Sequence, residues 1–428
     1  MGAGPLTVLF MPESAYGPTN NCIGIGDVLR RRGHRVVFAA EASWQGRLEP
    51  LGFEEDLVDL SPPATGEQDA GQFWKEFIAR TAPEFRKPTI DQLETWIKPV
   101  WEELTGGARY CHEQLATIVN RARPDVIVED NVVCFPALVT AGAPFVRIVS
   151  CNPLEIAGPD LPPPFSGYPV ADQAGRGEFR AENERVHRAL WGEFNEWVTS
   201  RGAPPLPDLE FIGEGSANLY IYPELADYQR ARPLRPTWHR IDSSVRQTDE
   251  PFTLPPALAA GDGPLVYFSL GSLGSADVSL MRRVIGCLAA TPCRYIVSMG
   301  PLHADLELAP NMWGAEFVPQ ASVLPLVDLV ITHGGNNTTT ECLHFGKPMI
   351  VAPLFWDQHD NAQRMAELGL GVRLDTYRFS DGDMHSALKR LLGDEALAAR
   401  LARGAGQIQA RQGLRRAADL IERAAQAG

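Results

Sequence analysis

The sequence has no apolar run that is long enough to cross a membrane. Its longest apolar stretches, at 124–129 and 347–356, have the length of β-strands, whereas a membrane-spanning helix needs about 20 consecutive apolar residues. The N-terminus lacks the basic stretch that opens a signal peptide and leads directly into a predicted strand at 6–10. We therefore expect a cytoplasmic protein without a membrane span.

Paired cysteines and an excess of positive charge are also missing. The seven cysteines are scattered and none forms a Cys-x-x-Cys pair, a pattern typical of reduced thiols. Against 39 lysines and arginines stand 53 acidic residues, which gives a formal net charge of −14. This balance argues against nucleic acid or an anionic membrane surface as a partner. Any phosphate that binds must therefore be held by local dipoles.

What the chain does have is the composition of a globular protein that is too long for one core. It contains 428 residues, of which 44% are hydrophobic and 21% charged. Predicted strands alternate with predicted helices in both halves, as in parallel βαβ units. We predict an α/β protein with an N-terminal domain over 1–242, a polar linker over 243–256, a C-terminal domain over 257–405, and a last helix over 406–428 that packs back towards the N-terminal domain.

The segment 317–361 is the most informative part of the sequence. Within it a predicted strand is followed by His333–Gly335, and a helix is predicted to begin at Asn337 or Thr338. Glycines let a ligand approach the backbone, and the free N–H groups and dipole of a helix start favour an anion. Glu341, about one turn further, places a carboxylate where a ribose diol can donate to it. The spacing indicates a site for a diphosphate flanked by a ribose and a sugar.

This segment resembles the donor-binding signature of the family-one glycosyltransferases, which include the UDP-glycosyltransferases of plants and the natural-product glycosyltransferases of actinobacteria. The motifs are aromatic-x-Pro-Gln at 317–320, His-Gly-Gly-x-Asn-Thr-x-x-Glu at 333–341, and Asp-Gln-x-x-Asn-Ala at 357–362. The resemblance implies the GT-B fold, in which two Rossmann-like parallel-sheet domains face each other across a cleft. It also implies inverting, metal-independent transfer of a hexose from a UDP-sugar to a small hydrophobic acceptor, without a cofactor.

The same resemblance assigns roles to residues of the donor site. Phe317 would stack near the uracil, Gln320 would bond the base, and Glu341 would take the ribose hydroxyls. Asp357 and Gln358 would bond the hexose, and a glutamine at the second position leans towards glucose in this family. The residues that would hold or admit the diphosphate are Ser272, His333, Gly335, Asn337 and Thr338. The histidine and the helix N-terminus would stabilise the leaving diphosphate in place of a cation.

The acceptor side departs from the family pattern. In most members the loop after the first strand reads Gly-His-x-x-Pro, and that histidine deprotonates the acceptor with help from an aspartate. Here Pro18 occupies the histidine position and Asn21 the proline position, and proline cannot accept a proton. Asp130 matches the partner aspartate. Since a carboxylate in an apolar cleft has a raised pKa, Asp130 is our candidate for the base, with Glu13 as the second.

Several alternatives stay open for the acceptor side. Asp130 could instead cap the N-terminus of the next helix, and Glu129 could be a solvated strand end. The acceptor could also be acidic enough, like a phenol, to need little help. We expect the acceptor site to be lined by Tyr16, Pro18 and Trp74, and further large aromatics of the same half suit an apolar acceptor (Phe77, Trp96, Trp101, Phe165, Trp191).

A different class of function also remains open. Because the usual histidine is missing, the chain could be a nucleotide-sugar-binding homologue or auxiliary protein without transferase activity. We expect a monomer or homodimer. The Asp-x-Asp spelling at 381–383, typical of metal-dependent transferases, follows Ser380 and is better explained as a helix start with acidic first-turn residues. The pair Gly24 and Gly26 lies in a predicted helix, lacks a third glycine, and indicates close helix–sheet packing.

Overall fold

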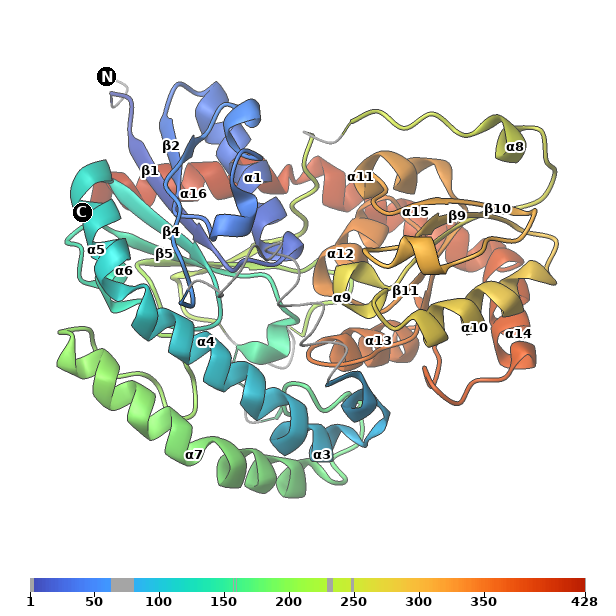
Figure 1. Ribbon diagram of the computed structural model, residues 1–428, viewed down its shortest axis with the longest axis horizontal. Coiled ribbons are helices and arrows are strands. Elements are labelled where there is room, and N and C mark those ends of the chain that lie inside the picture. Colours follow the sequence, from blue (N-terminus) through green and yellow to red (C-terminus); the bar gives the residue numbers. More distant parts are fainter. Residues whose placement is uncertain are drawn as a thin grey trace.

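The computed structural model describes residues 4–62, 81–156, 158, 160–228, 234–247 and 250–427. Each half of this chain is built on one sheet whose neighbouring strands are all parallel. The two halves lie side by side in Figure 1, with the N-terminal half on the left and the C-terminal half on the right. Two parallel sheets with helices in each half are the architecture that the sequence predicts.

The N-terminal sheet has seven strands in the order β3-β2-β1-β4-β5-β6-β7. Their bounds are β1 Thr7–Pro12, β2 Arg35–Phe38, β3 Glu54–Glu55, β4 Val126–Asp130, β5 Phe145–Val149, β6 Ala217–Ile221 and β7 Trp238–Ile241. All five residues of β4, β5 and β6 are buried. Burial on both faces is what a parallel sheet covered by helices requires, and it explains why apolar residues predominate in these strands without alternating with polar ones.

The helices and turns of this half cover both faces of the sheet. The helices are α1 Tyr16–Arg31, α3 Thr89–Gln92, α4 Lys98–Tyr110, α5 His112–Ala122, α6 Pro136–Val139 and α7 Arg176–Ser200. The first of them begins at Tyr16, so much of the segment that the family pattern treats as a loop is already helical. Trp74 and Phe77, which we expected near the acceptor, lie outside the described residues.

The C-terminal sheet has six strands in the order β10-β9-β8-β11-β12-β13. Its strands are β8 Leu265–Ser269, β9 Arg294–Ser298, β10 Met312–Ala315, β11 Leu329–Thr332, β12 Met349–Val351 and β13 Gly371–Arg373. Its helices are α8 Pro256–Ala259, α9 Gly271–Gly274, α10 Val278–Ala289, α11 Gln320–Val323, α12 Asn336–His344, α13 Gln358–Glu367, α14 Asp381–Leu392 and α15 Glu395–Ala410. The order reverses between β8 and β11, the place where ligands bind in such sheets.

The last helix, α16 (Gly413–Ala427), leaves the C-terminal half and packs on the N-terminal one. It contacts α1 and the strands β4 to β7, and Figure 1 shows it in red behind the blue and teal strands. Its buried face consists of Ala417, Ala418, Leu420, Ile421 and Ala424. This apolar stripe recurs at helical spacing, so burial of one face explains the position of the helix.

Two short patterns can be compared directly with the structure. The Asp-x-Asp spelling does begin α14, where the Ser380 side chain accepts from the N–H of Asp383 and the Asp383 side chain accepts from the N–H of Ser380. A Cβ added at Gly26 would lie 3.4 Å from Val36 in the sheet, as expected for helix–sheet packing. At Gly24 the expectation was wrong, because a Cβ there would meet Leu414 of α16 and the Ser244 carbonyl instead.

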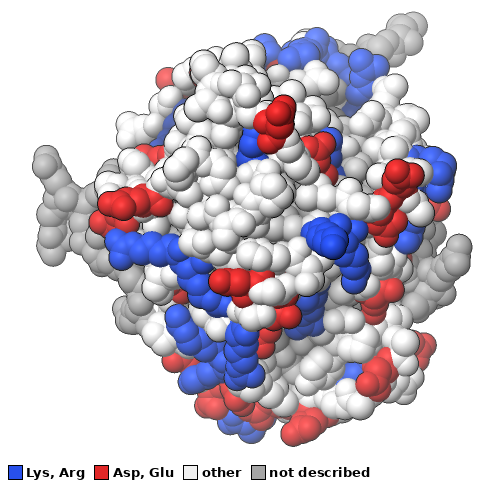
Figure 2. Space-filling view, turned by 90° about the vertical axis from the view of Figure 1, so that its right-hand side faces the viewer, with Lys and Arg blue, Asp and Glu red and all other residues white. Residues whose placement is uncertain are grey.

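Figure 2 shows acidic and basic side chains intermixed on the outer face of the C-terminal half, without a broad field of one sign. Within the described ranges, the helices are all too short or too polar to cross a membrane.

Candidate functional site

The carboxyl ends of the two sheets face each other, and side chains cross between them. Asn337 Nδ2, in the first turn of α12, donates to the Gly17 carbonyl in α1 over 2.9 Å. The neighbouring Asn336 Nδ2 donates to the carbonyl of Ile221, the last residue of β6, over 3.0 Å. The start of α12 therefore lies directly against the N-terminal half, at the expected position of the cleft.

The start of α12 is shaped around one imidazole. The helix begins at Asn336, one residue before the predicted position, with Gly335 as its N-cap. A Cβ added at Gly335 would lie 2.6 Å from His333 Nε2, and one at Gly271 would lie 2.7 Å from His333 Cε1. The imidazole is thus seated between two glycines, and Ser272, the residue after Gly271, is exposed.

Burial decides the charge of this imidazole. It lowers the pKa of His333 to about 4, against a weaker effect of a backbone hydrogen bond to Ser269 that favours the charged form. At neutral pH His333 is therefore uncharged. It can bond a phosphate oxygen as a donor, but it adds no full positive charge, so the attraction for an anion comes from the N–H groups and dipole at the start of α12.

The residues predicted to bind the nucleobase and the ribose are hydrogen-bonded to each other. Gln320 Nε2 donates to Glu341 Oε2 over 2.6 Å and to Thr338 Oγ1 over 3.2 Å. The other oxygen of this buried carboxylate, Glu341 Oε1, accepts from Arg246 over 3.2 Å. The structure brings three of the predicted donor residues together, and it adds an arginine that the sequence analysis did not single out.

Phe317 lies at the rim of this group. Its side chain is 59% exposed, and its ring stacks near that of Tyr16 from the opposite half. The Tyr16 hydroxyl accepts from Arg47 over 2.8 Å. An exposed ring beside the Gln320 amide is a suitable platform for a flat heterocycle.

Asp357 and Gln358 begin α13 and are both bonded within the protein. Asp357 Oδ2 accepts from the backbone N–H of Asn152 over 2.8 Å, across the cleft. Burial, assisted by the Glu155 carboxylate, raises the pKa of Asp357 to about 7 although its hydrogen bonds favour the charged form. Gln358 Oε1 accepts from the N–H groups of Leu354 and Phe355, which fixes the direction of the amide.

Asp130 ends β4 and is almost fully buried. Ser150 donates to its Oδ1 over 2.6 Å, and Asn21 Nδ2 donates to its Oδ2 over 3.3 Å. Burial is the main cause that raises the pKa of Asp130 to about 7, and the two hydrogen bonds oppose it. The turn after β5 thus contacts two candidate carboxyls, because Ser150 bonds Asp130 while Asn152 bonds Asp357.

The alternative in which Asp130 caps the next helix is wrong. That helix, α6, begins only at Pro136 with Phe135 at its N-cap, and the intervening N–H groups of Val132 and Val133 donate to Asn131. Glu129 is also not a solvated strand end, because its side chain is fully buried. Within the described part of the chain, both of its oxygens lack a hydrogen-bond partner.

The other candidates of this side have local partners. Glu13 accepts from the N–H of Ala15 over 2.8 Å and from the Ser14 hydroxyl over 3.0 Å, at the start of α1. Burial raises its pKa. Pro18 lies in the first turn of α1. Glu13 therefore supports the helix start near Pro18, and Asp130 is the carboxyl that Asn21 contacts.

The large aromatic side chains form a layer between the halves. Trp96 lies 5.0 Å from Phe355 and Trp101 lies 5.1 Å from Trp356, measured between ring centroids, and Phe165 contacts Trp356 at 4.4 Å. Trp96 and Trp101 thus pack on the loop that leads to Asp357. An apolar acceptor that reaches this region would meet aromatic rings from both halves.

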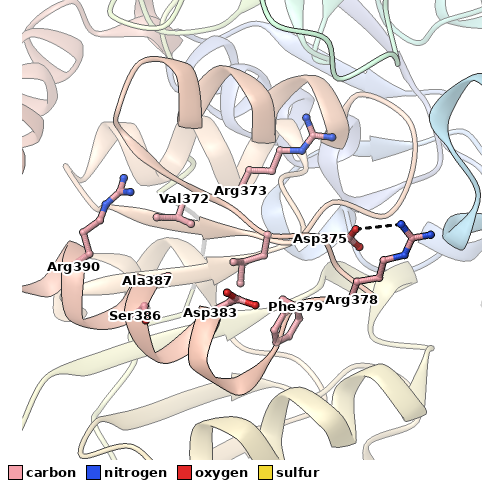
Figure 3. A pocket seen from close by; sticks show the side chains of 10 residues that line it. Val372, Arg373, Asp375, Arg378, Phe379, Asp383, Ser386, Ala387 and Arg390 are labelled. Carbon is pink, nitrogen blue, oxygen red and sulfur yellow. Dashed lines mark ion pairs between the residues drawn. The ribbon is translucent and has the colours of Figure 1, made fainter.

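The hollows on the outside of the protein do not coincide with these residues. One of about 420 Å³ is lined by 372–375 and residues of α14. The guanidinium groups of Arg373, Arg378 and Arg390 at its edge point in different directions (Figure 3). A second hollow of about 210 Å³ lies beside the proline-rich stretch 204–207. Among the described residues, no three His, Cys, Asp or Glu side chains converge in a way that could hold a metal ion.

Four residues near the site were not among the predicted site residues: Asn21, Ser150, Asn152 and Arg246. Asn21 was noticed only as a departure from the family pattern. A polar residue directly after the buried strand β5 was the available signal for Ser150 and Asn152, because the carboxyl ends of parallel strands face the cleft. Arg246 carried no signal, since it lies in the stretch 243–256 that the sequence predicts to be a polar linker between the domains.

The comparisons with known proteins point in one direction. Residues 215–403 match the model of the family described as "UDP-glucoronosyl and UDP-glucosyl transferase". The chain is 32% identical over 414 residues to the NDP-glycosyltransferase YjiC of Bacillus subtilis (strain 168), with 95% of this chain and 94% of that protein covered. It is 26% identical to the oleandomycin glycosyltransferase of Streptomyces antibioticus, with 98% and 90% covered.

Solved structures agree in fold. The glycotransferase of kitacinnamycin superposes with a TM-score of 0.71 at 24% identity, with 98% of this chain and 99% of that chain covered. The calicheamicin glycosyltransferase CalG4 gives a TM-score of 0.66 at 19% identity, with 99% and 98% covered. Both likenesses extend over the two sheets, the cleft between them and the C-terminal helix.

Proposed function

Because this chain belongs to the UDP-glucuronosyl and UDP-glucosyl transferase family and has the GT-B fold, we propose that it transfers a hexose from a UDP-sugar to a small hydrophobic natural product. Glucose is the favoured hexose, and the transfer inverts the anomeric configuration. The observation that carries the proposal is the contact of Gln320, Glu341 and Thr338 beside the start of α12.

On the donor side, the ligand would be held by hydrogen bonds and a helix dipole. The diphosphate would lie against the N–H groups at the start of α12, with neutral His333 as a further donor. Glu341 would accept from the ribose and Gln320 would bond the base. Binding of this kind suits a protein with a formal charge of −14, and the proposal involves no metal ion or cofactor.

On the acceptor side, Asp130 would act as the base. Its pKa of about 7 leaves a substantial ionised fraction at neutral pH while keeping the carboxylate basic enough to take a proton. The acceptor hydroxyl would give its proton to Asp130 as its oxygen forms a bond to the anomeric carbon. The bond from that carbon to the diphosphate breaks, and the start of α12 stabilises the charge that develops on the leaving phosphate.

An acceptor screen with UDP-glucose, read by mass spectrometry, tests the proposal. We expect products heavier than the acceptor by one hexose unit, and NMR should show inversion at the anomeric carbon. The same screen with dTDP-glucose, side by side, tests the choice of nucleotide. Calorimetry that detects no binding of UDP or dTDP, together with no transfer to any acceptor, would refute the proposal.

A nucleotide-sugar-binding protein without transferase activity is the second candidate. It is favoured by one observation, the proline at position 18 where most of the family has its catalytic histidine. UDP-glucose that binds tightly yet is neither hydrolysed nor transferred would support this candidate. Any inverted product excludes it.

A further inference from the structure

The segment Ser243–Arg246, which the sequence predicts to be the start of a polar linker between the domains, enters the protein interior. The side chains of Ser243, Ser244 and Arg246 are all buried. A Cβ added at Gly24 of α1 would lie 3.4 Å from the Ser244 carbonyl and 3.5 Å from Arg246 Cβ. At Gly413, the first residue of α16, it would lie 2.4 Å from the Ser243 carbonyl. The segment is therefore held tightly between α1 and α16.

One end of this segment reaches the candidate base. The Ser244 hydroxyl donates to Asn21 Oδ1, and Asn21 Nδ2 donates to Asp130 Oδ2. Because the hydroxyl occupies the amide oxygen, the amide nitrogen is turned towards the carboxyl, where it favours the charged form of Asp130. Ser244 thus fixes the direction of the Asn21 amide, which contacts Asp130 from α1.

The other end of the segment reaches the donor site. The Arg246 guanidinium donates to Glu341 Oε1, while Gln320 donates to Oε2 of the same carboxylate. Both charged side chains of the Arg246–Glu341 pair are at least nine-tenths buried. The arginine thereby holds in position the carboxylate that we assign to the ribose.

We propose that Ser244 and Arg246 are positioning residues of the transfer reaction, with Ser244 acting through Asn21 on Asp130 and Arg246 acting on Glu341. The inference rests on the proposed function. The two residues are only two positions apart in the connection between the halves. This short segment therefore sets the position of the catalytic carboxyl, Asp130, relative to Glu341, the carboxylate that would bind the ribose. Ser243 is not part of this arrangement, because its hydroxyl pairs with His344 Nδ1 over 2.8 Å.

The ionisable groups around Asp130 stay the same in the variants that test this proposal. The titratable groups that influence it or are influenced by it are Glu13, Cys22, Glu129, Cys151 and Glu155. Ser244→Ala removes no ionisable group and leaves all five in place. A change in the pH dependence of turnover would therefore report on the Asn21 amide.

The experiment measures two quantities in each variant: the Kd of UDP by calorimetry, and the pH at which kcat falls on the acid side. Ser244→Ala should move the acid limb of kcat upward by about half a pH unit, because the charged form of Asp130 loses a fixed donor. Its Kd for UDP should stay within about twofold of the wild-type value. Ser243→Ala, equally buried and matched in chemistry, should change neither quantity.

Arg246 should give the opposite pattern. Arg246→Met should weaken UDP binding about tenfold or more and leave the acid limb of kcat in place. Arg246→Lys keeps a positive charge on a shorter side chain, so its Kd for UDP should lie between those of the wild type and of Arg246→Met. If the Met variant does not fold, the Lys variant carries the test through the same two measurements.

Several outcomes would overturn the proposal. The first is that variants at 244 and at 246 change both the Kd of UDP and the acid limb of kcat. The second is that Ser244→Ala leaves the acid limb of kcat where it is in the wild type. The third is that Arg246→Lys and Arg246→Met leave the Kd of UDP unchanged. A double-mutant cycle that combines Arg246→Met with Glu341→Gln adds a further check. If Arg246 acts through Glu341, Arg246→Met should weaken UDP binding only little in the Glu341→Gln protein. A wild-type protein that binds no UDP would refute the proposed function. If the wild type binds UDP and transfers the hexose, but the variants at 244 and 246 do not separate the effect on the acid limb of kcat from the effect on the Kd of UDP, only this inference is refuted.

Discussion

The ring of Tyr16 lies 6.1 Å from the ring of Phe317, and the two planes are inclined by 30°. Tyr16 begins the first helix of the N-terminal half, whereas Phe317 precedes α11 in the C-terminal half. Both side chains are exposed, at 40% and 59%. The rim of the cleft is thus closed by a stacked pair that a nucleobase can join or replace.

Phe317→Leu should weaken UDP binding about fivefold, because an aromatic platform contributes about 1 kcal/mol beyond its buried area. Phe317→Trp should retain the affinity, and calorimetry with UDP measures both. Tyr16→Leu is the informative comparison: if the base stacks on Phe317 alone, this variant binds UDP as the wild type does. Equal Kd values for Phe317→Leu and the wild type would contradict the assignment.

Glu341→Ala should abolish measurable binding of UDP-sugar in calorimetry. The ribose would lose its acceptor, and Arg246 would be left as a buried cation without its carboxylate. Part of the loss will therefore be structural. Glu341→Gln separates the two effects, since it keeps an oxygen for Arg246, and its Kd should still rise about tenfold or more. An unchanged affinity in both variants would refute the ribose assignment.

Asp130→Asn should reduce kcat by about a hundredfold or more while the Kd of UDP stays close to the wild-type value. In the wild type, kcat should fall as the pH drops below about 7, the pKa of Asp130. A variant that turns over at the wild-type rate with both substrates saturating would remove Asp130 from the mechanism. An acidic phenol as acceptor should narrow the difference between variant and wild type, because it needs less help in losing its proton.

The same carboxyl should also affect stability in a pH-dependent way. Since the pKa of Asp130 is raised on folding from its usual value of 3.8 to about 7, the folded state binds an extra proton between those values. The contribution of Asp130 to stability is therefore present at low pH and lost as the pH rises towards 7. Thermal unfolding should show Asp130→Asn close to the wild type at about pH 4, increasingly more stable than the wild type as the pH rises towards 7, and more stable by a constant amount at about pH 8. A difference that does not change with pH would contradict the raised pKa.

Gly335→Ala should displace the imidazole of His333. The backbone at Gly335 has φ of −55°, which alanine adopts freely, so the collision at 2.6 Å with His333 Nε2 is the main effect. Overpacking of this kind lowers stability by about 1–3 kcal/mol, and UDP binding should weaken as well. Gly286→Ala is the matched control, because an added Cβ there meets nothing within 4 Å. Denaturant unfolding and calorimetry measure the two effects.

The grouping of Gln320, Thr338 and Glu341 could be predicted from sequence because these residues lie in one short segment of the chain. The interval from His333 to Glu341 lies on one strand end and one helix, so the order of residues already sets their spacing. Only the exact helix start, at Asn336, differed by one residue. The alternating strands likewise predicted the two parallel sheets, since buried parallel strands leave continuous apolar runs in the sequence.

The contacts of Asn21 and Arg246 could not be predicted in the same way because they join distant segments. Asn21 and Asp130 are 109 positions apart, and Arg246 and Glu341 are 95 apart. The polar residues at 243–246 look like a solvated connection, yet they are buried because each finds a partner on another element. Periodicity shows which residues avoid water, but it cannot show which polar groups will be satisfied by one another.

The position of α16 has a consequence for the order in which the protein can fold. The sheet of the N-terminal half is covered on one face by α16, which follows the whole C-terminal half in the chain, through Ala417, Leu420 and Ile421. Until α16 has left the ribosome, the apolar residues that it covers on this face of β4 to β6 lack their contacts with it. The N-terminal half is therefore incompletely folded during this time. A stop codon before residue 413 would therefore be expected to damage the beginning of the protein rather than its end, and to yield aggregated chains.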